Sequence, residues 1–277
     1  MEWFIKQTEK GRFDVKNPYN NKIRSIPANP CDVNTIVFWS KNFEPFIDGA
    51  YGTYLKEKGY NLFFNFTINS DSNLLEPNIP PLNERLSQLN RLSEIFGSEC
   101  INLRFDPICF YKTNKESLLN NMKDFNKIIT SAAEFGIKRC ITSFMDHYPK
   151  IKKRVSAING FSFIEPPTEK KIETLIEMGE KALKHNIELF LCCEKTLLDF
   201  LPKNLRINNS SCINNVLLAK LYGGNISFKK DYGQRVQKGC GCNVSVDIGS
   251  YAKHPCYNNC LFCYANPSDK IKTSGKL

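Results

Sequence analysis

The sequence lacks an apolar run of the length that a membrane-spanning helix requires. Such a helix needs about 20 predominantly apolar residues, and no segment of this 277-residue chain approaches that length. The chain also opens without the apolar core of a secretory signal peptide, because "MEWFIKQTEK" is charged and amphipathic. We therefore expect a cytoplasmic protein that has no membrane partner.

The sequence has neither a low-complexity tract nor a change in composition that would mark a second domain. Its length suits one large domain, since single α/β barrels commonly have about 250 residues. We expect one domain over residues 1–277, with residues 238–277 as a cysteine-rich segment packed on it.

Basic residues outnumber acidic residues by 38 to 28, which gives the chain a formal charge of +10. This charge is compatible with acidic partners such as nucleic acid. However, no basic block is interleaved with aromatic residues, which favours a solvated, lysine-rich surface over a nucleic-acid interface. A non-catalytic nucleic-acid-binding protein with a structural zinc or iron–sulfur knuckle is kept as the alternative function, because of this charge and the basic segment "PKIKKR".

Apolar segments of strand length alternate with segments of helical character. The expected strands cover residues 34–40, 61–68, 100–108, 138–144 and 186–194. The expected helices cover residues 43–58, 82–96, 115–135 and 168–185. This alternation predicts parallel βα units. We expect an α/β fold with a partial (βα) barrel of the TIM type, and a doubly wound sheet is the alternative.

Polar side chains occupy one face of several expected strands near their carboxyl ends. In "INLRFDP", Asn102, Arg104 and Asp106 share one face, because side chains alternate along a strand. A parallel sheet that is covered on both faces would be apolar throughout. The pattern predicts a polar pocket at the carboxyl ends of the strands, where the active sites of βα barrels lie. An internal ion pair of Arg104 with Asp106 or Glu188 is the structural alternative.

We assign six residues to this expected pocket, namely Asn65, Arg104, Asp106, Ser143, Asp146 and Glu194. Arg104 is expected to bind a carboxylate or phosphate through paired hydrogen bonds. Asp106 is expected to orient the substrate or to move a proton. Asp146 and Glu194 are further catalytic candidates, while Asn65 and Ser143 are candidates for binding a cofactor.

Cysteine is abundant, with twelve residues in the chain. Five of them lie in "GCGCNVSVDIGSYAKHPCYNNCLFCYAN", namely Cys240, Cys242, Cys256, Cys260 and Cys263. In a reducing compartment, clustered cysteines bind metal or act in catalysis more often than they form crosslinks. Structural zinc prefers four thiolate or imidazole ligands, whereas an iron–sulfur cubane is held by thiolates. His254 is a candidate for a supporting role beside either metal centre.

The last three cysteines have offsets of four and three residues, and Phe262 directly precedes the last one. Three such thiolates can bind three irons of a cubane and leave the fourth iron open, as catalytic zinc keeps an open position. The pattern resembles the hallmark of radical S-adenosylmethionine enzymes. The resemblance implies a [4Fe–4S] cluster on Cys256, Cys260 and Cys263, S-adenosylmethionine on the open iron, and Phe262 near the adenine.

The same resemblance implies the reaction and its partners. Electron transfer from an external donor, such as flavodoxin or ferredoxin, would cleave S-adenosylmethionine to a 5′-deoxyadenosyl radical. The radical would abstract a hydrogen atom from a small-molecule or nucleic-acid substrate that the sequence does not identify.

Most of the chain resembles one family in particular, domain-of-unknown-function family 1848. The matching phrases include "TIVFWSKNFEPF", "LEPNIPPLNERL", "TSFMDHY" and the cysteine-rich segment quoted above. That family carries the cysteine motif at the C-terminus, and we expect "VSVDIGSY" before it to be a strand that closes the barrel. Family members generally begin with an extra strand, which we expect to be missing before the helix of "MEWFIKQTEKG".

The Gly-Gly-Glu motif of radical S-adenosylmethionine enzymes has its nearest counterpart in "LYGGN", where Asn225 stands in place of the glutamate. We interpret Gly223 and Gly224 as a turn or the C-cap of a helix.

The remaining cysteines near the expected strand ends have open roles. Cys240 and Cys242 can ligate a second cluster, form a redox pair or line the site. Cys192, Cys193 and Cys212 can face the same pocket, or they can be small buried hydrophobic residues.

Overall fold

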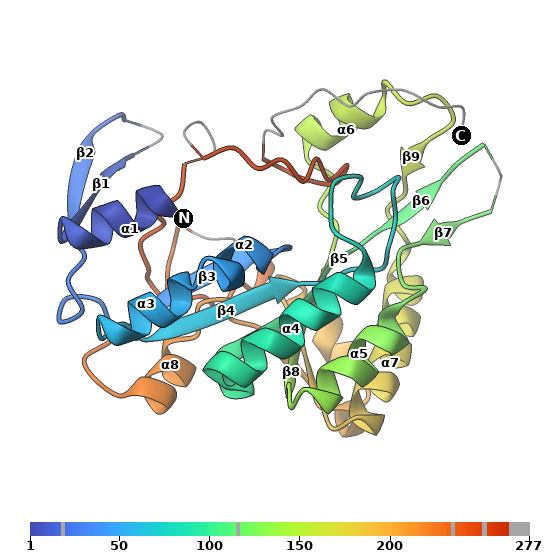
Figure 1. The fold of residues 1–277 in the computed structure, drawn as a ribbon. Coiled ribbons are helices and arrows are strands. Elements are labelled where there is room, and N and C mark those ends of the chain that lie inside the picture. The colour runs from blue at the N-terminus through green and yellow to red at the C-terminus, as the bar shows by residue number, and fades with distance from the viewer. Residues whose placement is uncertain (18–19, 115–116, 234–235, 251–253, 266–277) are drawn as a thin grey trace.

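The computed structural model describes residues 1–17, 20–114, 117–233, 236–250 and 254–265. A six-stranded sheet with the order β11-β10-β8-β5-β4-β3 forms its centre (Figure 1), and all its strand pairs are parallel. The strands are β3 (Ile36–Ser40), β4 (Leu62–Thr67), β5 (Ile101–Ile108), β8 (Arg139–Phe144), β10 (Glu188–Leu191) and β11 (Ile207–Asn209). The predicted α/β fold with parallel strands is confirmed, and β3 and β11 form the edges of the described sheet.

Helices between the strands pack on one face of the sheet, with α4, α5 and α7 below it in Figure 1. They are α2 (Glu44–Asp48), α3 (Tyr51–Glu57), α4 (Leu82–Phe96), α5 (Phe125–Glu134) and α7 (Thr168–Lys184). The prediction for 82–96 matches α4. The helix expected over 43–58 is instead two helices, because Ala50 adopts a left-handed backbone conformation with φ of 50° between them. The helix expected over 115–135 begins only at Phe125, since β7 forms a strand pair just before it.

The core lies between this helical layer and the sheet. On α4, Leu82, Leu86, Leu89 and Leu92 are buried at the three- and four-residue spacing of an amphipathic helix. They share one hydrophobic cluster with the phenylalanines of β4, among them Phe64. Each such side chain stabilises the fold by about 1.5–3 kcal/mol through burial.

The opposite face of the sheet is polar, as the alternation along the strands predicts. The Asn102 amide donates to the Asn65 side-chain oxygen at 3.1 Å, and Arg139 donates to the Asn102 side-chain oxygen at 3.0 Å. Buried polar groups are stable only when they are hydrogen-bonded in this way.

The remaining elements surround the sheet. They are α1 (Glu2–Glu9), β1 (Arg12–Lys16), β2 (Ile23–Pro27), β6 (Phe110–Lys112), β7 (Leu119–Asn120), α6 (Pro149–Val155), β9 (Ser162–Phe163), α8 (Asn215–Tyr222) and four short 3-10 helices at Ser98–Cys100, Lys195–Phe200, Lys203–Leu205 and Val236–Lys238. The expected helix of "MEWFIKQTEKG" is α1. Within the described residues, the structure has no helix that is both long enough and apolar enough to cross a bilayer.

Two expectations about the C-terminal half have opposite outcomes. The C-cap interpretation of Gly223 is confirmed, since this residue ends α8 with φ of 65°. The strand expected in "VSVDIGSY" is wrong for residues 244–250, which form no strand. At the start of this segment Val244 donates to the Lys229 carbonyl at 2.9 Å, next to an isolated bridge of Asn243, and no strand ladder follows. Tyr251 of this segment lies outside the described residues.

Candidate functional site

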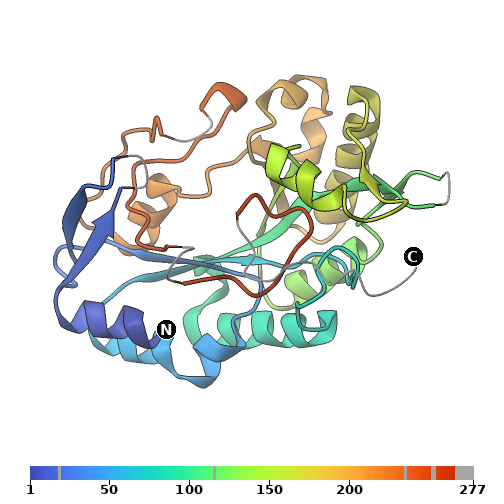
Figure 2. The same ribbon diagram turned by 90° about the horizontal axis from the view of Figure 1, so that it is seen from above.

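The cysteine loop, which we define as residues 256–265, lies over the carboxyl ends of the central strands. It contacts the segment that follows β4, since Leu261 donates to the Leu75 carbonyl at 2.9 Å and Asn78 donates to the Tyr257 carbonyl at 2.7 Å. Figure 2 shows the C-terminal segment in red, lying over the sheet beside α6. Active sites of α/β barrels lie at this end of the strands.

A single arginine of α6 holds the cysteine loop. Arg154 Nη1 donates to the carbonyl oxygens of Cys260 at 3.1 Å, Leu261 at 2.9 Å and Cys263 at 2.8 Å, and Nη2 donates to that of Ala265 at 3.1 Å. The segment "PKIKKR" therefore belongs to α6, and its arginine binds the cysteine loop of the same chain.

A buried ion pair lies directly beside the loop. Lys41 follows β3, and its Nζ is 2.6 Å from Glu76 Oε1, whose side chain is 3% exposed. Cys260 Sγ donates to the same carboxylate oxygen at 3.6 Å, and Lys41 Nζ lies 5.3 Å from the centre of the Phe262 ring. Burial lowers the pKa of Lys41, but the nearby Glu76, Cys260 and Asp106 outweigh this effect and raise it. Lys41 is therefore a cation beside Cys260 and Phe262.

The three thiols of the loop differ in exposure, with Cys260 buried, Cys263 half-buried and Cys256 exposed. They are close enough to interact, because Cys263 and Cys256 both raise the pKa of Cys260, although burial is the largest cause of that increase. Their donor chemistry fits a thiolate-bound metal. Within the described residues, however, no group of three or more His, Cys, Asp or Glu side chains is arranged to hold a metal ion, so binding requires these side chains to rotate. His254 stacks on Trp3, with ring centres 4.1 Å apart.

Cys240 and Cys242 belong to a different group from the cysteine loop. They share a buried cluster with the cysteines that follow β10 and β11, and we name these five residues the inner cysteine group: Cys192, Cys193, Cys212, Cys240 and Cys242. Cys192 Sγ lies 3.7 Å from Cys193 Sγ and 3.5 Å from Cys212 Sγ. Cys242 is close enough to Cys212 and Cys240 to interact with both.

Arg104 connects the inner cysteine group to Asp106. Its Nη1 donates to Cys212 Sγ at 2.9 Å, and its Nη2 donates to Asp106 Oδ2 at 2.7 Å. Ser143 Oγ donates to the other oxygen of Asp106. Burial lowers the pKa of Arg104, and the neighbouring Cys212 and Asp106 outweigh it and raise the pKa. The internal ion pair that the strand pattern allowed is thus present, with Asp106 as its acidic partner.

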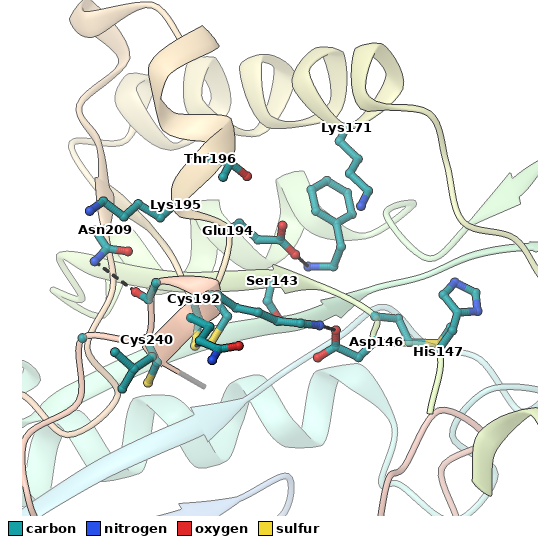
Figure 3. A pocket seen from close by; sticks show the side chains of 18 of the residues that line it. Ser143, Asp146, His147, Lys171, Cys192, Glu194, Lys195, Thr196, Asn209 and Cys240 are labelled. Carbon is teal, nitrogen blue, oxygen red and sulfur yellow. Dashed lines mark hydrogen bonds and ion pairs between the residues drawn. The ribbon is translucent and has the colours of Figure 1, made fainter. Parts of the chain in front are cut away.

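A polar cavity of about 740 Å³ opens beside these groups (Figure 3). Ser143, Asp146, Glu194 and Cys240 line it, and the first three are among the residues that the sequence analysis assigned to a pocket. Asp146 forms an ion pair with Lys238. Glu194 Oε1 accepts from the Phe144 amide at 3.3 Å, and burial raises the pKa of Glu194.

Asn65 does not reach the cavity. Its side chain is fully buried, and its Nδ2 donates to the Cys212 carbonyl at 3.3 Å. Asn65 therefore connects β4 to the inner cysteine group through this hydrogen bond, because the alternation along β4 places its side chain on the polar face of the sheet. The sequence analysis also missed Lys41, Glu76 and Arg154. A signal existed for Lys41, which directly follows an apolar strand, but the contacts of Glu76 and Arg154 join segments far apart in the chain.

Comparisons with known proteins identify a family and distant structural likenesses. A family model described as "Domain of unknown function (DUF1848)" matches residues 1–265. No curated protein matches the chain. Among solved structures, the chain is similar to "Crystal structure of D-hydantoinase" at 15% identity and a TM-score of 0.35, with 73% of this chain and 46% of that chain covered.

A second solved structure is "Molecular Structure of D-Hydantoinase from a Bacillus sp. AR9: Evidence for mercury inhibition". It has 13% identity and a TM-score of 0.34, with 73% of this chain and 47% of that chain covered. The chain spans about half the length of the two solved structures.

Proposed function

The chain belongs to the DUF1848 family, and we propose that it is an iron–sulfur enzyme of the radical S-adenosylmethionine type. The observation that carries the proposal is the position of the cysteine loop. Its three thiols lie over the carboxyl ends of a parallel sheet, beside a buried cation. Met145 packs in one hydrophobic cluster with Cys260 and Phe262 and also lines the polar cavity, so it connects the loop to that cavity. In this proposal the sheet is the strand layer of a partial (βα) barrel.

The residues of the loop have distinct roles in this proposal. Cys256, Cys260 and Cys263 hold a [4Fe–4S] cluster, and Phe262 flanks the cofactor. When bound, the cluster and S-adenosylmethionine supply the one-electron chemistry that leads to hydrogen-atom abstraction. Arg154 positions the loop through its hydrogen bonds to four backbone carbonyls.

Lys41 and Glu76 recognise the amino-acid end of the cofactor in this proposal. Their side chains form an ion pair beside Cys260. S-adenosylmethionine carries a carboxylate and an ammonium group on one carbon, and a cation next to an anion is complementary to that pair of charges. In this proposal, the Lys41–Glu76 pair takes the place of the glutamate of the Gly-Gly-Glu motif, where this chain has Asn225.

The substrate occupies the cavity, where Ser143, Asp146 and Glu194 offer polar contacts. Asp106 holds Ser143 and Arg104 in place and is itself 21% exposed at its side chain. Glu194 is the group that exchanges a proton with the substrate in this proposal, because burial raises the pKa of its carboxyl above the ordinary value.

The experiment is the iron content of two matched variants after anaerobic reconstitution. Cys260→Ala should bind less iron and have weaker iron–sulfur absorbance than the control variant, while its circular dichroism is unchanged. Cys31→Ala is the control, because Cys31 is exposed and belongs to neither cysteine group. Equal iron in both variants would contradict the proposal. Zinc without iron, together with DNA or RNA binding that weakens steeply with salt, would favour the nucleic-acid-binding alternative.

A further inference from the structure

The inner cysteine group is a second cluster of thiols. Arg104 connects it to Asp106, because one guanidinium nitrogen donates to Cys212 and the other donates to Asp106. Its five thiols come from three separate segments, after β10, after β11 and at 240–242. Free cysteine is usually a small buried hydrophobic residue. Such a residue needs no cation, yet the buried guanidinium of Arg104 donates directly to Cys212 Sγ at 2.9 Å.

Two of the sulfur separations are close to those of a thiolate-bound metal ion, although the five side chains are not arranged around one centre. With zinc–sulfur distances of about 2.3 Å, a tetrahedral site places neighbouring sulfurs about 3.8 Å apart. The measured separations are 3.7 Å from Cys192 to Cys193 and 3.5 Å from Cys192 to Cys212. Cys242 packs in the same cluster and is close enough to Cys212 to affect its pKa, so it adds a third segment to the group.

The backbone is shaped to bring these sulfurs together. Adjacent residues of a strand point to opposite faces, but Cys193 has φ of 63°. This left-handed conformation, which is costly for a residue other than glycine, accompanies the contact between the sulfurs of Cys192 and Cys193. On the other segment, a Cβ on Gly241 would lie 2.9 Å from the Ser210 carbonyl oxygen. Only glycine lets the turn with Cys240 and Cys242 approach so closely.

The hydrogen bonds and charge around the group would support a bound metal ion. The Ile213 amide donates to Cys242 Sγ at 3.5 Å, and such outer hydrogen bonds orient and tune thiolate ligands. Four thiolates on a divalent ion carry a net negative charge, which Arg104 beside Cys212 offsets. Cys192, Cys193 and Cys240 also line the cavity, and Figure 3 shows Cys192 and Cys240 on the same side of it.

We infer that the inner cysteine group is a second, thiolate-bound metal site, with Cys192, Cys212 and Cys242 as ligands and Cys193 or Cys240 as the fourth. It takes a thiophilic centre, either a zinc-type ion or an iron–sulfur cluster. Loading deprotonates the thiols and rotates them from their present sulfur–sulfur contacts towards one centre. The site is separate from the cysteine loop and does not depend on the function proposed for that loop.

The test uses the full chain with Cys256, Cys260 and Cys263 replaced by alanine, so that the inner cysteine group is the remaining cluster of thiols. Titration with Co²⁺ should show about one equivalent bound per chain, with the sulfur-to-metal charge transfer and intense visible bands of a four-coordinate thiolate site. Anaerobic reconstitution with iron and sulfide distinguishes a cluster from a single ion, and either result supports the site.

Three further changes are made in that background. Cys212→Ala should weaken Co²⁺ binding at least hundredfold, because even changes outside the ligand set cost about 10–100-fold. Gly241→Ala should weaken it at least tenfold. Cys140→Ala is the control, since Cys140 is a buried cysteine that lies outside the group, and the affinity of this variant for Co²⁺ should be unchanged.

A folded protein that binds no Co²⁺ and no iron would overturn the inference. Equal affinity in the Cys212→Ala and Cys140→Ala variants would also overturn it.

Discussion

Arg154 offers the sharpest mutational prediction, because one side chain holds most of the cysteine loop. Arg154→Met keeps the aliphatic stem of the side chain but removes every donor. The loss affects the carbonyl oxygens of Cys260, Leu261, Cys263 and Ala265. We expect the loop to open locally while the sheet stays folded.

The size of the effect follows from the hydrogen bonds. A hydrogen bond to a charged group contributes about 1.5–3 kcal/mol, and two nitrogens of Arg154 donate. Because Arg154 is half-buried, water replaces part of the loss, so we take the lower end of the sum, about 3 kcal/mol. Every 1.4 kcal/mol is about tenfold in an equilibrium constant, which makes local opening about a hundredfold more frequent.

Hydrogen exchange measures this opening directly. The reporters are the amides of Leu261 and Cys263, which donate to the carbonyls of Leu75 and Cys260. Their exchange should become about a hundredfold faster, while the amides of β4 and α4 should be unaffected. The matched control is Lys153→Met, an exposed position on the same helix. Unchanged exchange in the loop, or an equal loss of protection throughout the sheet, would refute the reasoning.

Three other changes test separate parts of the structure. Burial raises the pKa of Glu194, so the charged carboxylate destabilises the folded protein at pH values above the unfolded-state pKa of about 4.3. Glu194→Gln should therefore raise the melting temperature at pH 7. This gain should shrink as the pH falls towards 4. An unchanged melting temperature at pH 7 would contradict the raised pKa of Glu194. Gly52→Ala should destabilise the fold by about 1–3 kcal/mol in urea unfolding, because the new Cβ would lie 2.3 Å from the Phe96 ring; equal stability would show that the ring moves freely. In mass spectrometry after alkylation, exposed Cys31 should react in the folded protein, whereas buried Cys140, with a pKa raised to about 12, should react only on unfolding.

The sequence predicts the parallel sheet well because its signal is local. Apolar segments of strand length, separated by amphipathic helices, locate five of the six strands to within a few residues. The sixth strand, β11, is missed because "INN" is short and polar, and its parallel pairing with β10 alone makes it a strand. "VSVDIGSY" fails for the opposite reason, since its alternation suits a strand but residues 244–250 find no neighbouring strand.

The candidate site is predictable only where its pattern is local. The offsets of Cys256, Cys260 and Cys263 are visible in the sequence, and so is the polar face with Arg104. The sequence does not separate Cys240 and Cys242 from the cysteine loop, because contacts with Cys212 place them elsewhere. The anchor of Arg154 on the loop spans more than a hundred residues of chain, and no short-range pattern reports such a contact.

Electron paramagnetic resonance of the anaerobically reconstituted, reduced protein tests the central claim most directly. It is recorded with and without S-adenosylmethionine, in the wild type and in a Lys41→Met variant. A reduced cubane signal that shifts when the cofactor is added, with a weaker shift in Lys41→Met, is the predicted result. A cubane signal that is indifferent to the cofactor, or the absence of any cluster signal in the wild type, would contradict the account.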